Sequence, residues 1–542
     1  MDTRGIIDSR RCDDRVGRVG RVGHVRPVRL FGGGLRLAAL LTALFVATPL
    51  LAGDLTPQEQ RGKQIYMDGT SPRGEKIGAY VGESLTEVPG SVATCASCHG
   101  PDGRGRPEAG VIPSDVTWDY LFKPYGHTHP QGRSHPAFTV ETLKESIVFG
   151  RDPAGNTIEA SMPIYLMSDE DLDDLVAYMR KLETDYDPGL SGGELRIGTL
   201  LPTRGQMAVI GQGILEVLAA FVDDLNARGG IHQRHLRLIE FPYDNTQGTP
   251  LAEATRLVAE GDVFALLSPV VIGADAEIGK LAESERVPVI GPLTLASPDP
   301  YSLNDFTFYL FAGLAEQVRG LVDFAAGDLA LAGARIAVLA ADDRSRGLAS
   351  AITAQCEAHG CSAEIVPAVA EQLAAARPDA VFYLGSGDLR ALLEKADEIG
   401  WRPYVLLPGA YVSEELFDLP AGFHKRVYLS YPTVPADQTS AALAEFRSLL
   451  EARGFAERHR ASQISALVAA RILAEGLKAA GRDLSRAKLL VALEKLYEFE
   501  TGLTPAITYG ANRRIGALGT YVVTLDLESR DFTPVGGWIV PR

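Results

Sequence analysis

Two cysteines and a histidine lie next to one another in the segment Cys95–His99, which reads CASCH. Two thiols separated by two residues can each add to one vinyl group of the same porphyrin, and the histidine that follows can bind the iron. A zinc site would need a second close pair of ligands, and the next pair, Cys356 and Cys361, lies far along the chain. A thioredoxin-like motif would need a strand–helix–strand context, which is missing here. Cys95 and Cys98 therefore predict one covalently bound haem c, with His99 as its proximal ligand.

The sixth iron ligand must come from another part of the chain. Met162, which is followed by Pro163 in an expected loop, is the favoured candidate, since a thioether opposite a histidine stabilises ferrous iron. The alternative ligands are His127, His129 and His135, and ligation by two histidines would lower the reduction potential. Iron with both axial positions filled has no open site for oxygen or peroxide. Because no catalytic constellation can be assembled elsewhere, we expect an electron carrier that is not an enzyme.

The first 52 residues are typical of a secretory signal peptide. They contain nine arginines, a short apolar run over residues 37–47, and a small residue at Ala52. A bilayer span needs about 20 apolar residues, so an uncleaved membrane anchor is the less favoured alternative. We expect a periplasmic protein. In such an oxidising compartment Cys356 and Cys361 are predicted to form either a small disulfide or two buried thiols.

Length and charge narrow the class of protein further. The 542 residues are too many for one hydrophobic core, and 46% hydrophobic with 23% charged residues is ordinary for a soluble globular chain. The formal net charge is −16, and the arginine-rich first 52 residues make the rest more acidic still. Such a surface repels nucleic acid and anionic lipid, so neither is an expected partner.

A Pro-, Gly- and Ser-rich linker at residues 187–194 divides the chain into two parts. Residues 53–186 are expected to form helices with long loops. In residues 195–542 short apolar strands alternate with amphipathic helices, which predicts α/β lobes with parallel sheets. This run is too long for one sheet, so we expect two lobes.

The first part, over residues 56–184, resembles a class I cytochrome c, an all-α fold. The features that carry the resemblance are Gly62 and Tyr66 in the first helix, the CASCH motif, Pro113, Met162-Pro163, and Tyr178 in the closing helix. In that family the first and last helices cross at a glycine, where an aromatic side chain such as Tyr178 packs closely. One departure is the 28 residues between Tyr66 and Cys95, where the family has far fewer. This insertion is expected either to meet a haem edge or a partner, or to be a passive loop.

The second part resembles a type I periplasmic binding protein of the leucine/isoleucine/valine-binding class. The resemblance is carried chiefly by residues 221–231 (FVDDLNARGGI) and 287–292 (VPVIGP). It implies two α/β lobes that are joined by three crossings and close on a small ligand. We assign residues 195–313 with 434–500 to the first lobe, and residues 314–433 with 501–542 to the second.

The resemblance also places five residues at the ligand cleft: Ile210, Leu293, Thr294, Arg344 and Ser386. The family's acidic partner for the ligand amine falls near residues 409–410, where this chain has no carboxylate. Burying an ammonium without an anionic partner is costly. The ligand is therefore predicted to be a small molecule other than a standard amino acid, more apolar, with an anionic end facing Arg344. The alternative is that Arg344 is a surface loop residue.

A cytochrome followed by such a binding protein resembles periplasmic proteins associated with pyrroloquinoline-quinone-dependent alcohol dehydrogenases. This implies an electron-transfer protein that serves a quinoprotein alcohol oxidation system, with a dehydrogenase or another cytochrome as redox partner. The alternative is a solute-binding protein of an ABC transporter, in which the haem senses redox state or tethers the protein and the partner is a permease. An enzyme ranks last.

Overall fold

The computed structural model describes residues 55–105, 111–129, 132–244, 246, 250–260, 262–296, 304–340 and 342–541. The side chains of Asp343, Arg344 and Glu414 are not part of that description. The predicted signal peptide, residues 1–52, lies outside the described residues. Among the residues that are described, no helix combines the length and the apolar character that a membrane span requires.

Two helices that cross at a glycine form the frame of the cytochrome region. Helix α1 (Pro57–Asp68) begins after Thr56, whose hydroxyl accepts from the Glu59 N–H in a capping box, and α5 (Asp169–Met179) has three acidic residues in its first turn. A Cβ atom added to Gly62 would lie 1.9 Å from the carbonyl oxygen of Asp174 and 2.7 Å from the Cβ of Tyr178. Only glycine permits this approach, so the predicted crossing is confirmed.

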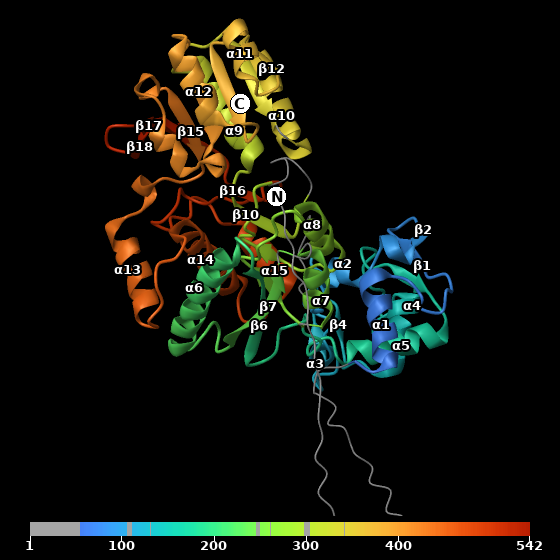
Figure 1. The fold of residues 1–542 in the computed structure, drawn as a ribbon. Coiled ribbons are helices and arrows are strands. Elements are labelled where there is room, and N and C mark those ends of the chain that lie inside the picture. The colour runs from blue at the N-terminus through green and yellow to red at the C-terminus, as the bar shows by residue number, and fades with distance from the viewer. Residues whose placement is uncertain are drawn as a thin grey trace, which may run out of the picture. The chain divides into compact units, whose positions relative to one another are not determined.

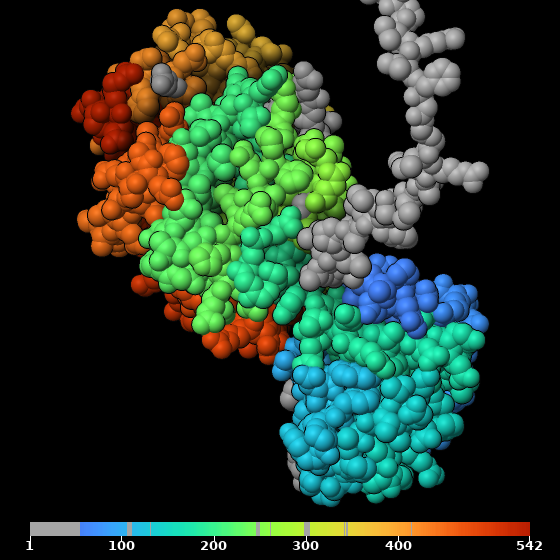
Figure 2. Space-filling model, turned by 90° about the horizontal axis from the view of Figure 1, so that it is seen from below, coloured from blue at the N-terminus to red at the C-terminus, as the bar shows by residue number. Residues whose placement is uncertain are grey.

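Three shorter helices complete the helical part of this region. They are α2 (Cys95–His99), α3 (Trp118–Leu121) and α4 (Val140–Phe149). Together with α1 and α5 they enclose one hydrophobic core, in which the rings of Tyr66 and Tyr178 lie 5.7 Å apart. Figure 2 shows residues 55–105 in blue and the following residues in cyan folded into one body.

The cytochrome region has two small antiparallel sheets in addition to its helices. The insertion before Cys95 forms a hairpin of β1 (Gly78–Val81) and β2 (Thr86–Pro89). The free edge of β1 pairs antiparallel with β5 (Ile164–Leu166), which gives a sheet of order β2-β1-β5. A second small hairpin joins β3 (His127–Thr128) to β4 (Ser134–His135). The insertion is therefore a paired element of the domain and not a passive loop.

The first lobe of the binding-protein region is a six-stranded parallel sheet of order β16-β10-β9-β8-β6-β7. Its strands are β6 (Glu194–Arg204), β7 (His235–Asp244), β8 (Ala265–Leu267), β9 (Val289–Ile290), β10 (Thr307–Phe311) and β16 (Ile515–Ala517). One face packs on α6 (Ala208–Ala227), α13 (Ser440–Glu451), α14 (Arg460–Ala480) and α15 (Arg486–Glu494). The other face packs on α7 (Leu251–Glu260) and α8 (Asp275–Ser284). Because helices cover both faces, the central strands are apolar throughout.

The second lobe is a seven-stranded sheet of order β12-β11-β13-β14-β15-β17-β18. In this sheet β17 pairs antiparallel with both of its neighbours, β15 and β18. The strands are β11 (Arg335–Ala340), β12 (Ser362–Ile365), β13 (Ala380–Leu384), β14 (Tyr404–Pro408), β15 (Val427–Tyr431), β17 (Thr520–Asp526) and β18 (Asp531–Ile539). Helices α9 (Leu314–Gly327) and α10 (Asp343–His359) pack on one face. Helices α11 (Ala370–Ala376) and α12 (Leu389–Glu398) pack on the other, as Figure 1 shows for this lobe.

The chain passes to the second lobe before α9 and returns to the first lobe before α13. We expected residues 501–542 to belong to the second lobe, but β16 pairs with β10 in the first sheet. Tyr509 and Ala517 also pack in the core of the first lobe. The chain therefore crosses for the third time between β16 and β17 and not near residue 500.

Candidate haem site and ligand-binding lobes

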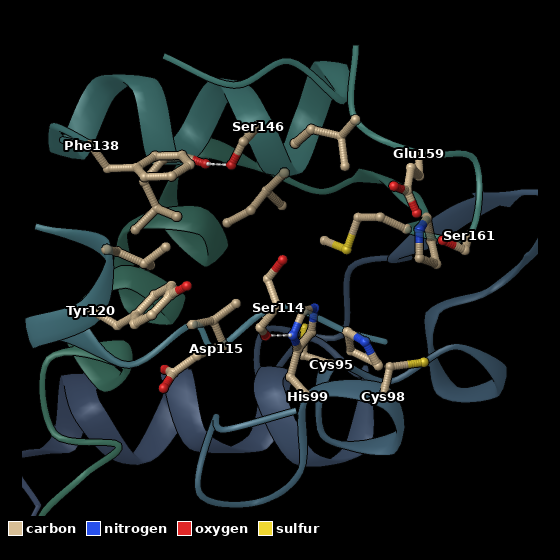
Figure 3. A pocket seen from close by; sticks show the side chains of 18 of the residues that line it. Cys95, Cys98, His99, Ser114, Asp115, Tyr120, Phe138, Ser146, Glu159 and Ser161 are labelled. Carbon is tan, nitrogen blue, oxygen red and sulfur yellow. Dashed lines mark hydrogen bonds between the residues drawn. The ribbon is translucent and has the colours of Figure 1, made fainter. Parts of the chain in front are cut away.

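A cavity of about 450 Å³ lies inside the cytochrome region. Its walls come from α2, the loop at residues 111–116, α4, the loop at residues 158–163 and the β3–β4 hairpin. Cys95, Cys98, His99 and Met162 all border it, together with all three histidines that were considered as alternative ligands. Figure 3 shows Glu159 and Ser161 on a loop across the hollow from His99. The structure thus brings the predicted haem-site residues together around one space.

His99 is held so that one ring nitrogen faces the cavity without a proton. The preceding helix α2 begins after Thr94, whose hydroxyl accepts from the Ser97 N–H. Nδ1 of His99 lies 2.8 Å from the carbonyl oxygen of Ser114, seen as a dashed line in Figure 3, and a carbonyl can only accept. Nδ1 must therefore carry the proton, which leaves the Nε2 lone pair for a metal. Burial lowers the pKa of His99 and favours this neutral ring.

The two thiols of the motif differ in exposure. Cys98 is exposed, whereas the half-buried Cys95 packs against the core of the domain. Burial raises the pKa of the Cys95 thiol to about 12, so without a bound group it stays protonated. Thioether formation would remove both thiols from this titration, and their position at the cavity edge fits attachment to one porphyrin edge.

Met162 lies in a tight turn that is tied at both ends. Its N–H donates to the carbonyl of Glu159 at 2.9 Å, and the N–H of Ile158 donates to the carbonyl of Gly150, the residue that ends α4. Strand β5 begins at Ile164, directly after Pro163. The loop therefore has little freedom to carry its thioether away from the cavity.

The three histidines of the β3–β4 hairpin already have hydrogen-bond partners. Nε2 of His129 and Nε2 of His135 lie 3.1 Å apart, Nδ1 of His135 lies 2.8 Å from the carbonyl of Pro136, and His127 contacts the hydroxyl of Tyr120. Burial, together with the nearby positive charge of Arg133, lowers the pKa of His129 to about 4. Within the described chain no group of three His, Cys, Asp or Glu side chains is arranged to hold a metal ion by itself.

The cavity is suited to an amphiphilic ring. Leu121, Phe138 and Leu175 supply apolar walls, while Arg133 and the hairpin histidines supply nitrogen donors along one side. A haem has the same division, because its apolar macrocycle carries two carboxylates. The residues present therefore fit the cofactor that the CASCH motif predicts.

The five predicted cleft residues all follow the carboxyl ends of parallel strands, where open α/β sheets bind ligands. Leu293 and Thr294 follow β9, and Ser386 follows β13. Leu293 packs against the first-lobe core, and the Thr294 hydroxyl bonds to the Asp275 carboxylate and accepts from the Ala296 N–H. Arg344 lies in the first turn of α10, but its side chain lies outside the described residues.

Ile210 lies in the first turn of α6. Its half-buried side chain packs against the first-lobe core. A pocket of about 280 Å³ beside it is lined by its neighbours Val209 and Gly211 and by Arg458, and not by Ile210 itself. Tyr411 follows β14, and its ring lies within 3.1 Å of a Cβ built on Gly385, which follows β13.

Cys356 and Cys361 are free thiols in the structure, and both are buried. Gly360, with a φ of 74°, ends α10 between them, as the sequence indicated. The Cys361 thiol donates to the carbonyl of Cys356 at 3.3 Å. The structure therefore has the second of the two predicted states, and the disulfide stays a prediction for the oxidised protein.

Two protein families match this chain in succession. The periplasmic binding protein family matches residues 194–530. The chain belongs to this family. The cytochrome c family matches residues 82–183, so the region around the haem-site cavity is a cytochrome c domain and implies a haem c. Members of the cytochrome c family are in general electron carriers, and members of the periplasmic binding protein family are in general binding proteins, not enzymes. Both families imply a periplasmic or other extracytoplasmic location.

Solved structures agree on the fold of the binding-protein domain. A fatty acid ABC transporter substrate-binding protein from Thermomonospora curvata has a TM-score of 0.52 and 15% identity over 65% of this chain and 94% of its own. A putative branched-chain amino acid ABC transporter protein from Rhodospirillum rubrum has a TM-score of 0.51 and 20% identity over 63% and 100%. A branched-chain amino acid ABC transporter protein from Thermus thermophilus with bound valine has a TM-score of 0.50 and 16% identity. The match covers 64% of this chain and 97% of its own. A search of curated proteins found no match.

Proposed function

We propose that this protein is an extracytoplasmic electron carrier whose binding-protein domain takes up a small organic solute. The observation that carries the proposal is the His99 ring, which the Ser114 carbonyl orients beside a cavity that Met162 also borders. Haem c bound there would supply reversible one-electron chemistry at iron. Cys95 and Cys98 would attach it, and His99 and Met162 would be the axial ligands.

The residues of the cavity would then do three things. The apolar walls around Leu121 and Phe138 would exclude water and so favour the less charged, reduced state of a bound haem. Arg133 and the hairpin histidines, which border the same cavity, would be available as hydrogen-bond donors to the haem carboxylates. With His99 and Met162 both bound to it, a haem here would supply electron transfer without an open position for a substrate.

The electron donor that we propose is a periplasmic dehydrogenase of the quinoprotein type, which oxidises a small alcohol. Stopped-flow mixing of the oxidised full-length protein with such a reduced dehydrogenase should give haem reduction at micromolar concentration. The same mixing with a Met162→Ala variant is the control, because its lower potential should slow the reaction. No reduction of the wild-type protein would rule out this donor while leaving the cytochrome assignment intact.

The solute that we propose is more apolar than an amino acid. In the second lobe the position near residues 409–410 carries no carboxylate, and the neighbouring side chain is Tyr411. Calorimetric titration should compare leucine with 4-methylpentanoate, which has the same carbon skeleton without the amine. We expect the second to bind more tightly, and submicromolar binding of leucine would contradict the proposal.

A second function is favoured by the similar solved structures, several of which are ABC transporter proteins. In that case the lobes deliver the solute to a permease, and the haem senses redox state. A solute affinity that changes between the reduced and the oxidised protein, together with no reduction by a dehydrogenase, would support this alternative.

A further inference from the structure

The insertion between α1 and α2 pairs with the strand that follows Met162. In the β1–β2 hairpin (residues 78–89) Gly78, Ala79 and Tyr80 lie opposite Leu166, Tyr165 and Ile164 of β5. We propose that this hairpin is a clamp that holds the Met162 loop against the haem cavity and thereby selects methionine as the sixth ligand. This inference rests on the proposed ligation of haem iron by Met162.

The contact between the hairpin and β5 is part of the domain core. Ala79 is fully buried opposite Tyr165, which is 4% exposed. Ile77, at the start of the hairpin, is 5% exposed and belongs to the same core as the α1 and α5 side chains. Separation of β1 from β5 would therefore expose apolar surface as well as break backbone hydrogen bonds.

Tyr165 also connects the methionine loop to the haem-attachment segment. Its hydroxyl donates to the carbonyl of Ala93 at 2.7 Å, two residues before Cys95, and its ring borders the cavity. Burial raises the pKa of Tyr165 far above its usual value, so the hydroxyl keeps the proton that it donates. Tyr165 is therefore a positioning residue that ties the two sides of the cavity together.

The hairpin is in turn anchored to α1. The N–H of Gly90 donates to the carbonyl of Ile77 at 2.9 Å, which closes the base of the hairpin. A Cβ on Gly90 would lie 2.6 Å from the carbonyl oxygen of Gly69, the left-handed residue with φ 63° that ends α1. Side chains at Gly69 and Gly90 would force these backbones apart, so the hairpin has a fixed origin from which to hold β5.

Such a clamp has a role because the cavity contains competing ligands. A thioether is a soft, uncharged ligand, and the imidazole rings of His127, His129 and His135 border the same space. Opening of the Met162 loop would let one of these rings, or an added ligand, bind in its place. The occupancy of methionine therefore depends on the free energy of local opening, which the hairpin increases.

Imidazole titration of the ferric full-length protein tests the clamp, since imidazole must displace the sixth ligand. In one variant a short glycine linker replaces residues 78–89, which is feasible because Ile77 and Gly90 are already hydrogen-bonded neighbours. In the matched control, Asn-Gly replaces only the tip, residues 82–85, and leaves the pairs with β5 in place. We expect imidazole affinity to rise at least tenfold in the first variant, with loss of the methionine-to-iron charge-transfer absorption, and to change less than twofold in the control.

A single-atom change keeps the test decisive if the shortened chain fails to fold. Tyr165→Phe should raise imidazole affinity about fivefold, the factor that corresponds to one neutral hydrogen bond of ~1 kcal/mol. Tyr125→Phe, at a side chain that is 85% exposed, should leave it unchanged. Wild-type affinity in the Tyr165 variant and in a folded hairpin deletion would overturn the clamp. Wild-type affinity in Met162→Ala would instead contradict ligation by Met162 itself.

Discussion

His99 and Met162 border the same cavity, but the chain holds them there by different means. His99 follows both cysteines in the one-turn helix α2, and its ring is oriented by the carbonyl of Ser114, 15 residues later in the chain. The Met162 loop is held by α4 and by a hairpin some 80 residues earlier in the chain. The histidine side depends on local sequence, whereas the methionine side depends on pairing between distant segments. Changes elsewhere in the domain should therefore affect methionine ligation first.

The largest effect should come from removing the two cysteines that precede His99. The double substitution of Cys95 and Cys98 by serine should abolish covalent haem completely, because no other thiols border the cavity in the described structure. The mass of the intact chain and its absorption after denaturation measure this directly. Substitution of Cys356 and Cys361 by alanine is the matched control, since these thiols lie in the second lobe. Loss of haem in that control would contradict the assignment.

Removal of the Met162 thioether should have a smaller effect. Met162→Ala should keep covalent haem but lower the reduction potential by on the order of 0.1 V or more, within the roughly 0.8 V that axial ligands span. Redox titration of the full-length protein measures the shift. Met167→Ala, at a methionine that packs on the core without bordering the cavity, should leave the potential within experimental error. An unchanged potential in the Met162 variant would favour a histidine of the β3–β4 hairpin.

A change at the crossing of α1 and α5 should destabilise the whole cytochrome domain, and with it the positions of both His99 and Met162. Gly62→Ala places a Cβ 1.9 Å from the Asp174 carbonyl oxygen, so α1 and α5 must separate. We expect a loss of about 3 kcal/mol in the free energy of unfolding of the cytochrome domain, at the upper end of overpacking effects. Denaturant unfolding followed by haem absorption measures it. Gly192→Ala, where an added Cβ meets open space, should have little effect.

The smallest effect should be a dependence on pH of the free energy of unfolding of the cytochrome domain, through Asp174 on α5. Burial alone would raise the pKa of Asp174, but hydrogen bonds from Arg61 and Arg73 outweigh burial and hold the pKa below its usual value. A depressed carboxyl pKa contributes stability above the unfolded value of about 4 and loses it as pH falls through the folded value. The free energy of unfolding should therefore drop below pH 4. Asp174→Asn should lower stability at pH 7 by about 2 kcal/mol and flatten this dependence; an unaltered pH profile would contradict the assignment.

The histidine side could be predicted from the sequence, and the clamp on the methionine side could not. The CASCH motif is local, so its chemistry and the position of His99 follow from adjacent residues. Strands β1 and β2 have four residues each and β5 has three, which is too short for a periodic pattern. Their pairing depends on the buried contact of Ala79 with Tyr165, which no local signal indicates. The expectation of an all-α domain therefore described its helices and omitted these short strands.

The binding-protein domain shows the same limit at larger scale. Long α/β alternation predicted both lobes, but the three-residue strand β16 joins the first sheet, so the last crossing was placed too early. The ligand cleft is predicted only through the family resemblance, which places its residues after several different strands. Of these, Ile210 and Leu293 pack against the first-lobe core.

The outer edge of β2 has one more consequence, which concerns aggregation. Any sheet edge can recruit a strand from another molecule, and a hairpin that ends in solvent is most exposed to this risk before the domain has folded. Strand β2 carries Glu87, which is paired with Lys76 at 2.8 Å, and it ends at Pro89, which cannot donate a backbone hydrogen bond. The three-stranded sheet therefore pairs with β5 at one edge and disfavours pairing with a strand of another molecule at the β2 edge.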